Sequence, residues 1–181
     1  TLLIGLFTLI CIYIVIVRLF IKKNPQFFLN GILPAQLVAF STSSSAATLP
    51  VTMDRVHNNL NVPKEVSSFV LPIGATINMD GTAVYQAIAA VFIAQTFGLD
   101  LTLGAQLGII VTATLASIGA AAVPSAGIIV LLIVLAQAGI PEAGLALIFA
   151  VDRPLDMCRT VVNITGDATV SMLVDKIISK K

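Results

Sequence analysis

The sequence predicts an all-α membrane protein built as an inverted repeat, in which each half contains a re-entrant helical hairpin followed by a broken transmembrane helix. Three observations predict this fold. Of 181 residues, 57% are hydrophobic and 10% charged, whereas about a quarter of the residues of a soluble domain are charged. Small and polar residues interrupt long apolar stretches, and this pattern occurs twice. Basic residues gather in alternate connecting segments.

The composition also excludes several classes of function. Ten Lys and Arg nearly balance nine Asp and Glu, so the chain has no basic surface for nucleic acid and no acidic tail. Cys11 and Cys158 are too few and too far apart to suggest a disulfide framework or a zinc site, and His57 is the single histidine. Metal-hydrolase and thiol chemistry are therefore not expected. From the hydrophobic composition we expect the protein to be surrounded by membrane lipid.

The first two segments are a transmembrane helix over residues 1–23 and a re-entrant hairpin over residues 27–56. The first apolar run ends at Arg18 and has about the length that a spanning helix needs. No charged leader precedes it, so we expect the chain to be the C-terminal part of a longer protein. Serines, threonines and a proline break the second apolar stretch at 40–50, and each half is too short to cross the bilayer alone.

Residues 66–99 form an interrupted transmembrane helix, with Asp80 as its single charge. Residues 101–141 carry no charge, and one helix of this length would measure about 60 Å, twice the hydrocarbon core. The small residues and the proline at 117–127 therefore predict a second re-entrant hairpin. Residues 142–177 are the last predicted transmembrane helix.

The distribution of basic residues tests this topology. If both interrupted stretches are hairpins, eight basic residues fall on one side of the membrane, which is then cytoplasmic and also holds the C-terminus. They are Arg18, Lys22, Lys23, Arg55, Lys64, Lys176, Lys180 and Lys181. The segments on the opposite side contain only Asp100 and Glu142. The test gives the same result if residues 101–141 cross the membrane twice, but their length favours the hairpin.

A weak internal repeat relates residues 27–97 to residues 101–175. Each half contains an interrupted hairpin followed by a helix with polar groups inside the membrane. The first hairpin enters from the cytoplasm and the second from outside, so the repeats are inverted. Inverted repeats with broken helices are typical of secondary transporters, whose substrates and coupling ions bind near the middle of the membrane.

The last helix carries a polar stripe. Asp152, Asp156, Arg159, Asn163 and Asp167 follow one another at intervals of three or four residues, which places them on one helix face. Each charged residue in the middle of the bilayer costs about 2.5–3.5 kcal/mol on insertion scales, so we expect the stripe to face a cavity within the protein. The alternative is a structural Asp–Arg pair that holds two helices together. One arginine cannot neutralise all the acids, however, and a cation or an amine would supply the missing charge.

Residues 78–82, Asn-Met-Asp-Gly-Thr, predict a cation site. They place amide, carboxylate, hydroxyl and carbonyl oxygens inside an apolar span, and such oxygens replace the hydration shell of a monovalent cation. The alternative is a kinked helix in which Asp80 caps the second half. The serine run at 43–45 and the hinge near Pro124 would each bring helix ends to the middle of the membrane, where free N–H groups attract a carboxylate and free carbonyls attract a cation.

These segments resemble the glutamate/aspartate:cation symporters, also named the dicarboxylate/amino acid:cation symporter family. The resemblance rests on three motifs: the serines at 43–45, the residues at 78–82, and Asp-Met-Cys-Arg-Thr-Val-Val-Asn-Ile-Thr-Gly-Asp at 156–167. It covers essentially all 181 residues, in the order of the family's sixth helix, first hairpin, seventh helix, second hairpin and eighth helix. The chain is therefore expected to be the C-terminal half of a transport domain.

The resemblance implies a substrate site. Arg159 would bind the side-chain carboxylate, Asp156 the amino group, and Asn163 together with Ser45 the α-carboxylate of an acidic amino acid. Residues 123–127 would form the tip of the second hairpin and act as the gate. The implied substrate-binding residues are Ser43, Ser44, Ser45, Thr82, Val123, Gly127, Asp156, Arg159, Thr160 and Asn163.

The resemblance also implies sodium sites, an elevator motion and a trimer whose contacts lie in upstream helices. The implied metal-binding residues are Gly74, Asn78, Asn163 and Asp167 for one sodium, Thr76, Ser117, Ile118 and Ala120 for a second, and Asn78 and Asp80 with an upstream helix for a third. Ser43 and Met157 stand where many relatives carry an additional arginine. Because that arginine is linked with how the carrier resets, potassium countertransport stays open.

The predicted function is sodium-coupled uptake of glutamate or aspartate across the plasma (cell inner) membrane by alternating access. Proton coupling stays open because carboxylates serve either ion. A dicarboxylate or neutral amino-acid symporter of the same fold is one alternative, although Asp156 argues against substrates without an amine and Arg159 against substrates without a second carboxylate. An intramembrane aspartyl protease with Asp80 and Asp167 as its dyad is a second alternative. Otherwise no enzymatic activity is expected.

Overall fold

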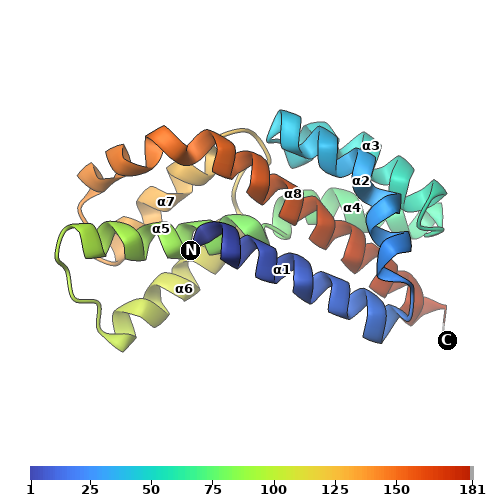
Figure 1. Cartoon of the computed structure of the whole chain (residues 1–181), viewed down its shortest axis with the longest axis horizontal. Coiled ribbons are helices and arrows are strands. Elements are labelled where there is room, and N and C mark those ends of the chain that lie inside the picture. Colours follow the sequence, from blue (N-terminus) through green and yellow to red (C-terminus); the bar gives the residue numbers. More distant parts are fainter. Residues whose placement is uncertain (180–181) are drawn as a thin grey trace.

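The computed structural model describes residues 1–179, so Lys180 and Lys181, two of the basic residues expected on the cytoplasmic side, lie outside it. Within residues 1–179 every regular element is a helix (Figure 1), which confirms the all-α prediction. The elements are α1 (Leu2–Ile16), η1 (Val17–Ile21), α2 (Pro25–Thr42), α3 (Ser45–Asn58), α4 (Lys64–Ile77), α5 (Asp80–Thr96), α6 (Leu103–Ile118), α7 (Ala126–Gln137), η2 (Glu142–Gly144) and α8 (Leu145–Ile178).

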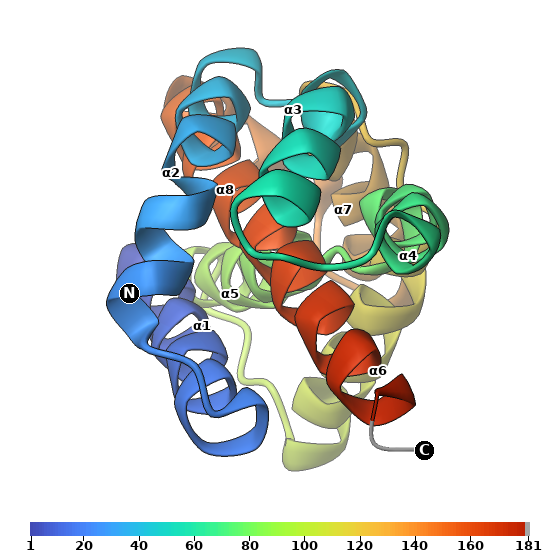
Figure 2. The same cartoon turned by 90° about the vertical axis from the view of Figure 1, so that its right-hand side faces the viewer.

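Helix α8 is the axis of the molecule. Its 34 residues correspond to a helix of about 51 Å, and it runs nearly the whole length of the molecule in Figure 1. The end-on view in Figure 2 shows it in the middle of the other helices. Helices α1, α2, α3, α4, α5 and α7 all contact it. The polar stripe of α8 is therefore surrounded by protein.

Two helical hairpins reach toward the middle of α8. The first consists of α2 and α3 and turns at Ser43, whose φ of 52° lies in the left-handed region. Ser44 begins α3 by accepting a hydrogen bond from the backbone N–H of Ala47 at 3.1 Å. The second hairpin consists of α6 and α7. Each of the four helices has 18 residues or fewer, or at most about 27 Å, which is short of the hydrocarbon core of about 30 Å.

The long helix predicted at 66–99 is broken into α4 and α5. Asn78 (φ −89°, ψ 76°) and Met79 (φ −109°, ψ 45°) connect the two helices with non-helical backbone. Although Asp80 opens α5, no side chain caps this helix. The interpretation of Asp80 as a helix cap is therefore wrong, and its carboxylate is free for another role.

Two hydrophobic cores lie along α8, on either side of its polar stripe. One core joins α5, α6 and α7 to the beginning of α8, and Leu131 and Ile148 are among its residues. The other joins η1, α2, α3 and α4 to the end of α8, and Phe28 and Met172 are among its residues. The buried charged residues Asp152, Asp156, Arg159 and Asp167 lie on α8 between Ile148 and Met172. Each core thus combines helices from both predicted repeats, and the polar layer lies between the two cores.

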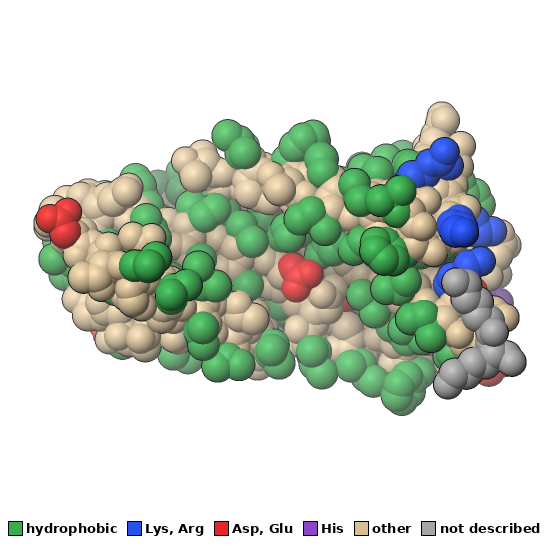
Figure 3. Space-filling view, turned by 90° about the horizontal axis from the view of Figure 1, so that it is seen from below, with side chains coloured by type: hydrophobic (Ala, Val, Ile, Leu, Met, Phe, Trp, Pro, Cys, Tyr) green, Lys and Arg blue, Asp and Glu red, His purple; other side chains and the backbone are tan. Residues whose placement is uncertain are grey.

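The outer surface matches a membrane environment. Large hydrophobic side chains are exposed along α1, α4, α6, α7 and the first half of α8, and on the face shown in Figure 3 Lys and Arg gather at one end of the molecule. The stretches Leu2–Ile21 and Lys64–Thr96 are long and apolar enough to cross a bilayer. A protein that spans a bilayer typically has an apolar surface around its sides and charged residues at its two ends.

Gly144 provides a test of this packing. A Cβ at Gly144 would lie 2.1 Å from the Cγ2 atom of Ile93, a fully buried side chain. We expect Gly144→Ala to cost about 1–3 kcal/mol through overpacking and to lower the midpoint of thermal unfolding of the detergent-solubilised protein. Gly104→Ala is the matched control, because its Cβ would meet its nearest neighbour at 3.9 Å. Equal melting temperatures for both variants would contradict the packing of η2 against α5.

Candidate functional site

The tips of both hairpins, the break between α4 and α5 and the middle of α8 surround a small cavity of about 20 Å³. Its lining residues are Ser43, Ser45, Met79, Thr82, Ala120, Ala121, Ala122, Val123, Ala126, Gly127, Asp156, Arg159, Thr160 and Asn163. Nine of the ten expected substrate-binding residues are in this set, and Ser44 is the exception. Segments that are far apart in the sequence therefore meet at one place.

Ser44 joins the two hairpin tips. Its hydroxyl donates a hydrogen bond of 2.6 Å to the backbone carbonyl of Ala122, and the backbone N–H of Ala46 donates to the same carbonyl at 3.3 Å. The Ser44 hydroxyl is therefore engaged with the other tip and does not face the cavity. The structure assigns Ser44 to tip-to-tip contact, while Ser43 and Ser45 line the cavity.

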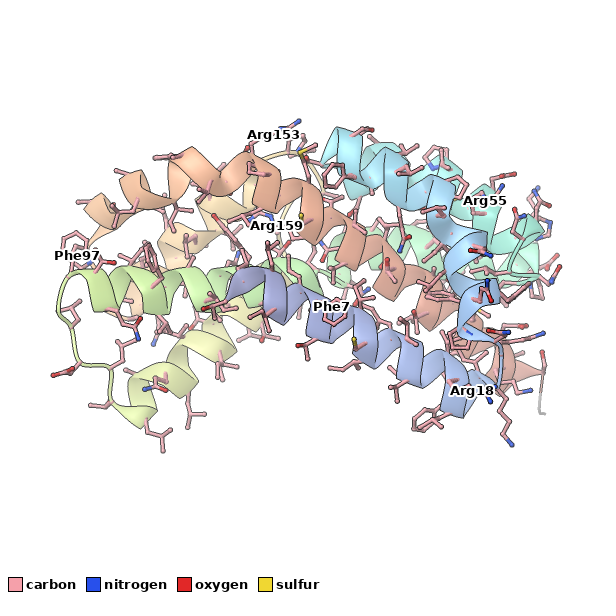
Figure 4. All side chains as sticks on the ribbon, viewed as in Figure 1. Phe7, Arg18, Arg55, Phe97, Arg153 and Arg159 are labelled. Carbon is pink, nitrogen blue, oxygen red and sulfur yellow. The ribbon has the colours of Figure 1, made fainter. Side chains whose placement is uncertain are left out.

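Arg159 is the cation at the wall of the cavity. Its side chain is 1% exposed and lies on the inner side of α8 (Figure 4). Its Nε atom donates to Asp156 at 2.8 Å, and its Nη2 atom lies 3.4 Å from Asp152. The guanidinium also stacks on the ring of Tyr85, 4.0 Å from the centroid, an arrangement that favours a cation. Two carboxylates thus share one arginine, which leaves this cluster with a formal charge of −1.

Tyr85 positions Asp152. Its hydroxyl donates to the Oδ1 atom of Asp152 at 2.9 Å, the same oxygen that contacts Arg159. Sequence reasoning placed Asp152 on the polar stripe but missed Tyr85. The chain contains only two tyrosines, and both hydrogen-bond to aspartates of the apolar segments. A tyrosine within a hydrophobic span was the signal available in the sequence.

The tip of the second hairpin is fixed to Asp156. The backbone N–H of Ser125 donates a 2.8 Å hydrogen bond to the Oδ2 atom of Asp156, and Ser125 has the left-handed φ of 61°. Gly127, at the beginning of α7, lies against Arg159, since a Cβ there would come within 2.5 Å of its Nη1 atom. In this arrangement the tip closes over the two residues expected to recognise the substrate.

Asn163 connects α8 to the break in the long helix. Its Oδ1 atom accepts a hydrogen bond of 2.8 Å from the backbone N–H of Gly81, and its Nδ2 atom lies 3.3 Å from the Thr82 hydroxyl. Gly81 is required here because a Cβ would lie 2.7 Å from the carbonyl oxygen of Arg159. The amide is thus held rigidly at the cavity wall, where Thr160 also lies.

Oxygen atoms gather on the other side of the same break. The side-chain amide of Asn78 donates to the Oδ1 atom of Asp167 at 2.9 Å and lies 3.4 Å from the carbonyl of Asn163. Gly74 packs on this carboxylate, because a Cβ at Gly74 would lie 2.6 Å from Asp167 Oδ1. The expected members of the first sodium site therefore lie together.

Asp80 has a partner that the sequence did not predict. The hydroxyl of Tyr13, on α1, donates to its Oδ2 atom at 2.6 Å. The described residues contain no group of three or more His, Cys, Asp or Glu side chains placed to hold a metal ion. A cation at this break would therefore depend on single carboxylates together with amide, hydroxyl and carbonyl oxygens, a set that suits a monovalent ion.

The expected second sodium site is assembled less completely. Thr76 is exposed, and its hydroxyl donates to the carbonyl of Ile73 in its own helix at 3.1 Å. Ser117 is buried but bonds in the same way to Thr114, and Ile118 is exposed at the end of α6. Ala120 lines the cavity described above. Helix α4 does contact α6, so the two segments are neighbours, but their hydroxyl groups turn toward their own helices.

Comparison with known proteins gives a family match over almost the whole chain. The model of the sodium:dicarboxylate symporter family matches residues 1–177. An excitatory amino acid transporter of Caenorhabditis elegans is 53% identical over 147 residues, which cover 81% of this chain and 29% of that protein. Human excitatory amino acid transporter 5 is 50% identical over 164 residues, covering 91% of this chain and 29% of that protein. Mouse excitatory amino acid transporter 3 is 50% identical over 177 residues, covering 98% and 33%.

These relatives are much longer than this chain, which spans about a third of their length. The match nevertheless includes every segment that surrounds the cavity, from Tyr13 on α1 to Asp167 on α8. With a family model that covers almost all of its residues and relatives about half identical to it, the chain belongs to the sodium:dicarboxylate symporter family.

Proposed function

We propose that this chain forms the substrate- and ion-binding part of a transporter that takes up glutamate or aspartate with sodium. The observation that carries the proposal is the pairing of Arg159 with Asp156 at a cavity that both hairpin tips close. A guanidinium selects a carboxylate through its planar fork of donors. A neighbouring aspartate selects an amine. An acidic amino acid offers both groups, and three of the relatives named above are excitatory amino acid transporters.

Substrate binding would exchange partners within the cluster. The side-chain carboxylate of the substrate takes the place of Asp156 on the Arg159 guanidinium, and Asp156 turns to the substrate amine. The α-carboxylate binds near Asn163 and Ser45. Because the Ser125 N–H now bonds to Asp156, the second hairpin tip has to move outward before the substrate can enter. The other expected substrate residues, Thr82, Val123, Gly127 and Thr160, form the remaining walls.

Sodium would bind on the far side of the break. Asn78, Asn163 and Asp167 supply its first site, with Gly74 allowing close approach of the backbone. A second site would form between Thr76 and the carbonyls of Ser117, Ile118 and Ala120 when the hairpin tip rearranges, and Asp80 would serve a third. Bound cations thus hold the helix break in the form that presents Asn163 and Thr82 to the substrate. Ion binding and substrate binding are coupled through that shared segment.

The transport step itself would be an elevator motion of this part within the plasma membrane. We propose that the hairpins are re-entrant, that the basic end seen in Figure 3 is cytoplasmic and holds the C-terminus, and that upstream helices assemble a homotrimer. The apolar sides of the molecule fit a position across the membrane, and the basic residues at one end support a cytoplasmic location of that end. An intramembrane aspartyl protease is not supported, because Asp80 bonds to Tyr13 whereas Asp167 bonds to Asn78, and the relatives are transporters.

Replacement of Arg159 tests substrate selection. In proteoliposomes of the complete protein, Arg159→Cys should lower the affinity for aspartate by about 30-fold or more, since removing one partner of a buried charge pair costs about 2–5 kcal/mol. Uptake of neutral amino acids should appear in its place. The control is Arg18→Cys, an exposed arginine at the end of η1. Radiolabelled aspartate and serine report both effects, and an unchanged aspartate affinity would defeat the assignment of Arg159.

Replacement of Asp167 tests the ion site. Asp167→Asn removes a charge from the first proposed sodium site but keeps its shape, so half-maximal aspartate uptake should require about tenfold more sodium. The aspartate selectivity over serine should not change. Glu142→Gln removes an exposed charge far from the cavity and serves as the control. If the sodium dependence of both variants equals that of the unmodified protein, Asp167 is not a ligand of the coupling ion.

Imposed gradients decide between the alternatives for coupling and substrate. We expect an inward sodium gradient alone to drive accumulation of labelled aspartate, and a proton gradient alone to leave it at background. Unlabelled succinate and serine should compete at least about tenfold more weakly than glutamate, because each lacks one of the groups that Asp156 and Arg159 recognise. Accumulation with a proton gradient and no sodium would assign a proton-coupled symporter instead.

A further inference from the structure

Arg153 is a charged residue that the substrate site does not use. It follows Asp152 on α8, yet its side chain is exposed and lies on the outer side of the helix (Figure 4). Within residues 1–179 the two ion pairs involve Arg159 and no other arginine. A guanidinium at this depth costs several kcal/mol against lipid. Phe149, one turn earlier on the same face of α8, is exposed as well, so the guanidinium would avoid acyl chains by extending along the helix toward its outer end.

The charge distribution makes Arg153 unusual. Figure 3 shows Lys and Arg gathered at one end of the molecule, and Figure 4 places Arg18 and Arg55 at the end where α8 finishes. Lys23 and Lys176 line one pocket there, while Lys22 follows η1 and Lys64 begins α4. The opposite end carries the exposed acids Asp100 and Glu142. Among residues 1–179, Arg153 is thus the one exposed basic side chain in the half of the molecule that a substrate would approach from outside.

The level of Arg153 on α8 is also informative. It lies three residues, or about 4.5 Å of helix rise, on the outer side of Asp156, and Asp156 holds the tip of the second hairpin through Ser125. Long helical side chains point back toward the N-terminus of their helix, which moves the guanidinium still further outward. A substrate coming from the side of Glu142 reaches this level of α8 before it reaches the closed tip.

We propose that Arg153 is an electrostatic capture residue, which attracts acidic amino acids to the outer side of the molecule, at the level of the closed second hairpin tip, before that hairpin opens. The inference rests on the proposed function, since it assigns Arg153 to the first step of the same uptake. The buried cluster of Asp152, Asp156 and Arg159 has a formal charge of −1 and does not itself attract an anion. A single exposed cation outside it offsets this negative charge and raises the rate of encounter with an anion. Arg153 does not bind the substrate in the closed cavity.

The experiment measures initial rates of aspartate uptake in proteoliposomes of the complete protein at a fixed sodium concentration. Ionic strength is varied with choline chloride, because the screening length falls from about 30 Å at 0.01 M to about 10 Å at 0.1 M. The variants are Arg153→Gln, Arg153→Lys and the control Arg18→Gln, which removes the same charge at the cytoplasmic end. At low ionic strength Arg153→Gln should raise KM about threefold and leave kcat unchanged. Arg153→Lys and Arg18→Gln should match the unmodified protein.

Salt provides the decisive comparison. The KM of the unmodified protein should rise with ionic strength until it meets that of Arg153→Gln, whose KM should change little. If the KM of Arg153→Gln exceeds that of the unmodified protein by the same factor at every ionic strength, the proposal is overturned, because Arg153 then makes a fixed contact with another segment. A KM of Arg153→Lys as high as that of Arg153→Gln would overturn it for the same reason. If Arg153→Gln does not fold, the salt dependence of the unmodified protein and the Lys variant still decides. Absence of any aspartate uptake by the unmodified protein would instead refute the proposed function.

Discussion

The buried guanidinium of Arg159 organises the centre of the molecule. A charge in a medium of low dielectric constant is tolerated only with close partners, and removal of one partner from such a pair costs about 3–5 kcal/mol. Arg159 obtains its partners from Asp152 and Asp156 on its own helix and from the ring of Tyr85 on α5. Asp156 in turn holds Ser125 at the tip of the second hairpin. The requirement of a buried guanidinium for close partners therefore determines where two other elements lie.

As re-entrant elements, which is what we propose, the two hairpins would satisfy a second requirement of the membrane interior. Irregular backbone inside a bilayer is tolerated only where protein or trapped water surrounds it. Both tips meet this condition by bonding to each other through Ser44 and Ala122. The helix break meets it through Asn163, which accepts a bond from the Gly81 N–H. The hydrophobic cores on either side shield these polar contacts. The cavity therefore forms where the two hairpin tips and the break between α4 and α5 satisfy one another's polar groups.

Much of this arrangement was predictable from the sequence, and the remainder has a physical reason. Helical periodicity places Asp156, Arg159 and Asn163 on one face, and the interruptions at 43–45 and 78–82 predict where helices break. Tyr13 and Tyr85 were missed because each lies 67 residues from the aspartate that it contacts, and local pattern carries no information at that separation. The second sodium site was expected from resemblance alone, and Thr76 turns toward its own helix. The orientation of a hydroxyl group depends on the ions that are bound, and the spacing of residues along the sequence does not predict that orientation.

The formal charges explain why such a site would need cations to take up an anion. Asp152, Asp156 and Arg159 sum to −1, and Asp80 and Asp167 bring the buried polar layer to −3. An acidic amino acid would add another negative charge to this layer. Coulomb repulsion at an effective dielectric constant of about 20 amounts to several kcal/mol at contact distances, so the substrate is excluded until positive charge enters. Because Asn163 contacts both the break that would hold the cation and the cavity that would hold the substrate, the two would bind next to one segment. Coupling would then follow from electrostatics between neighbouring sites, and it would require no long-range signal.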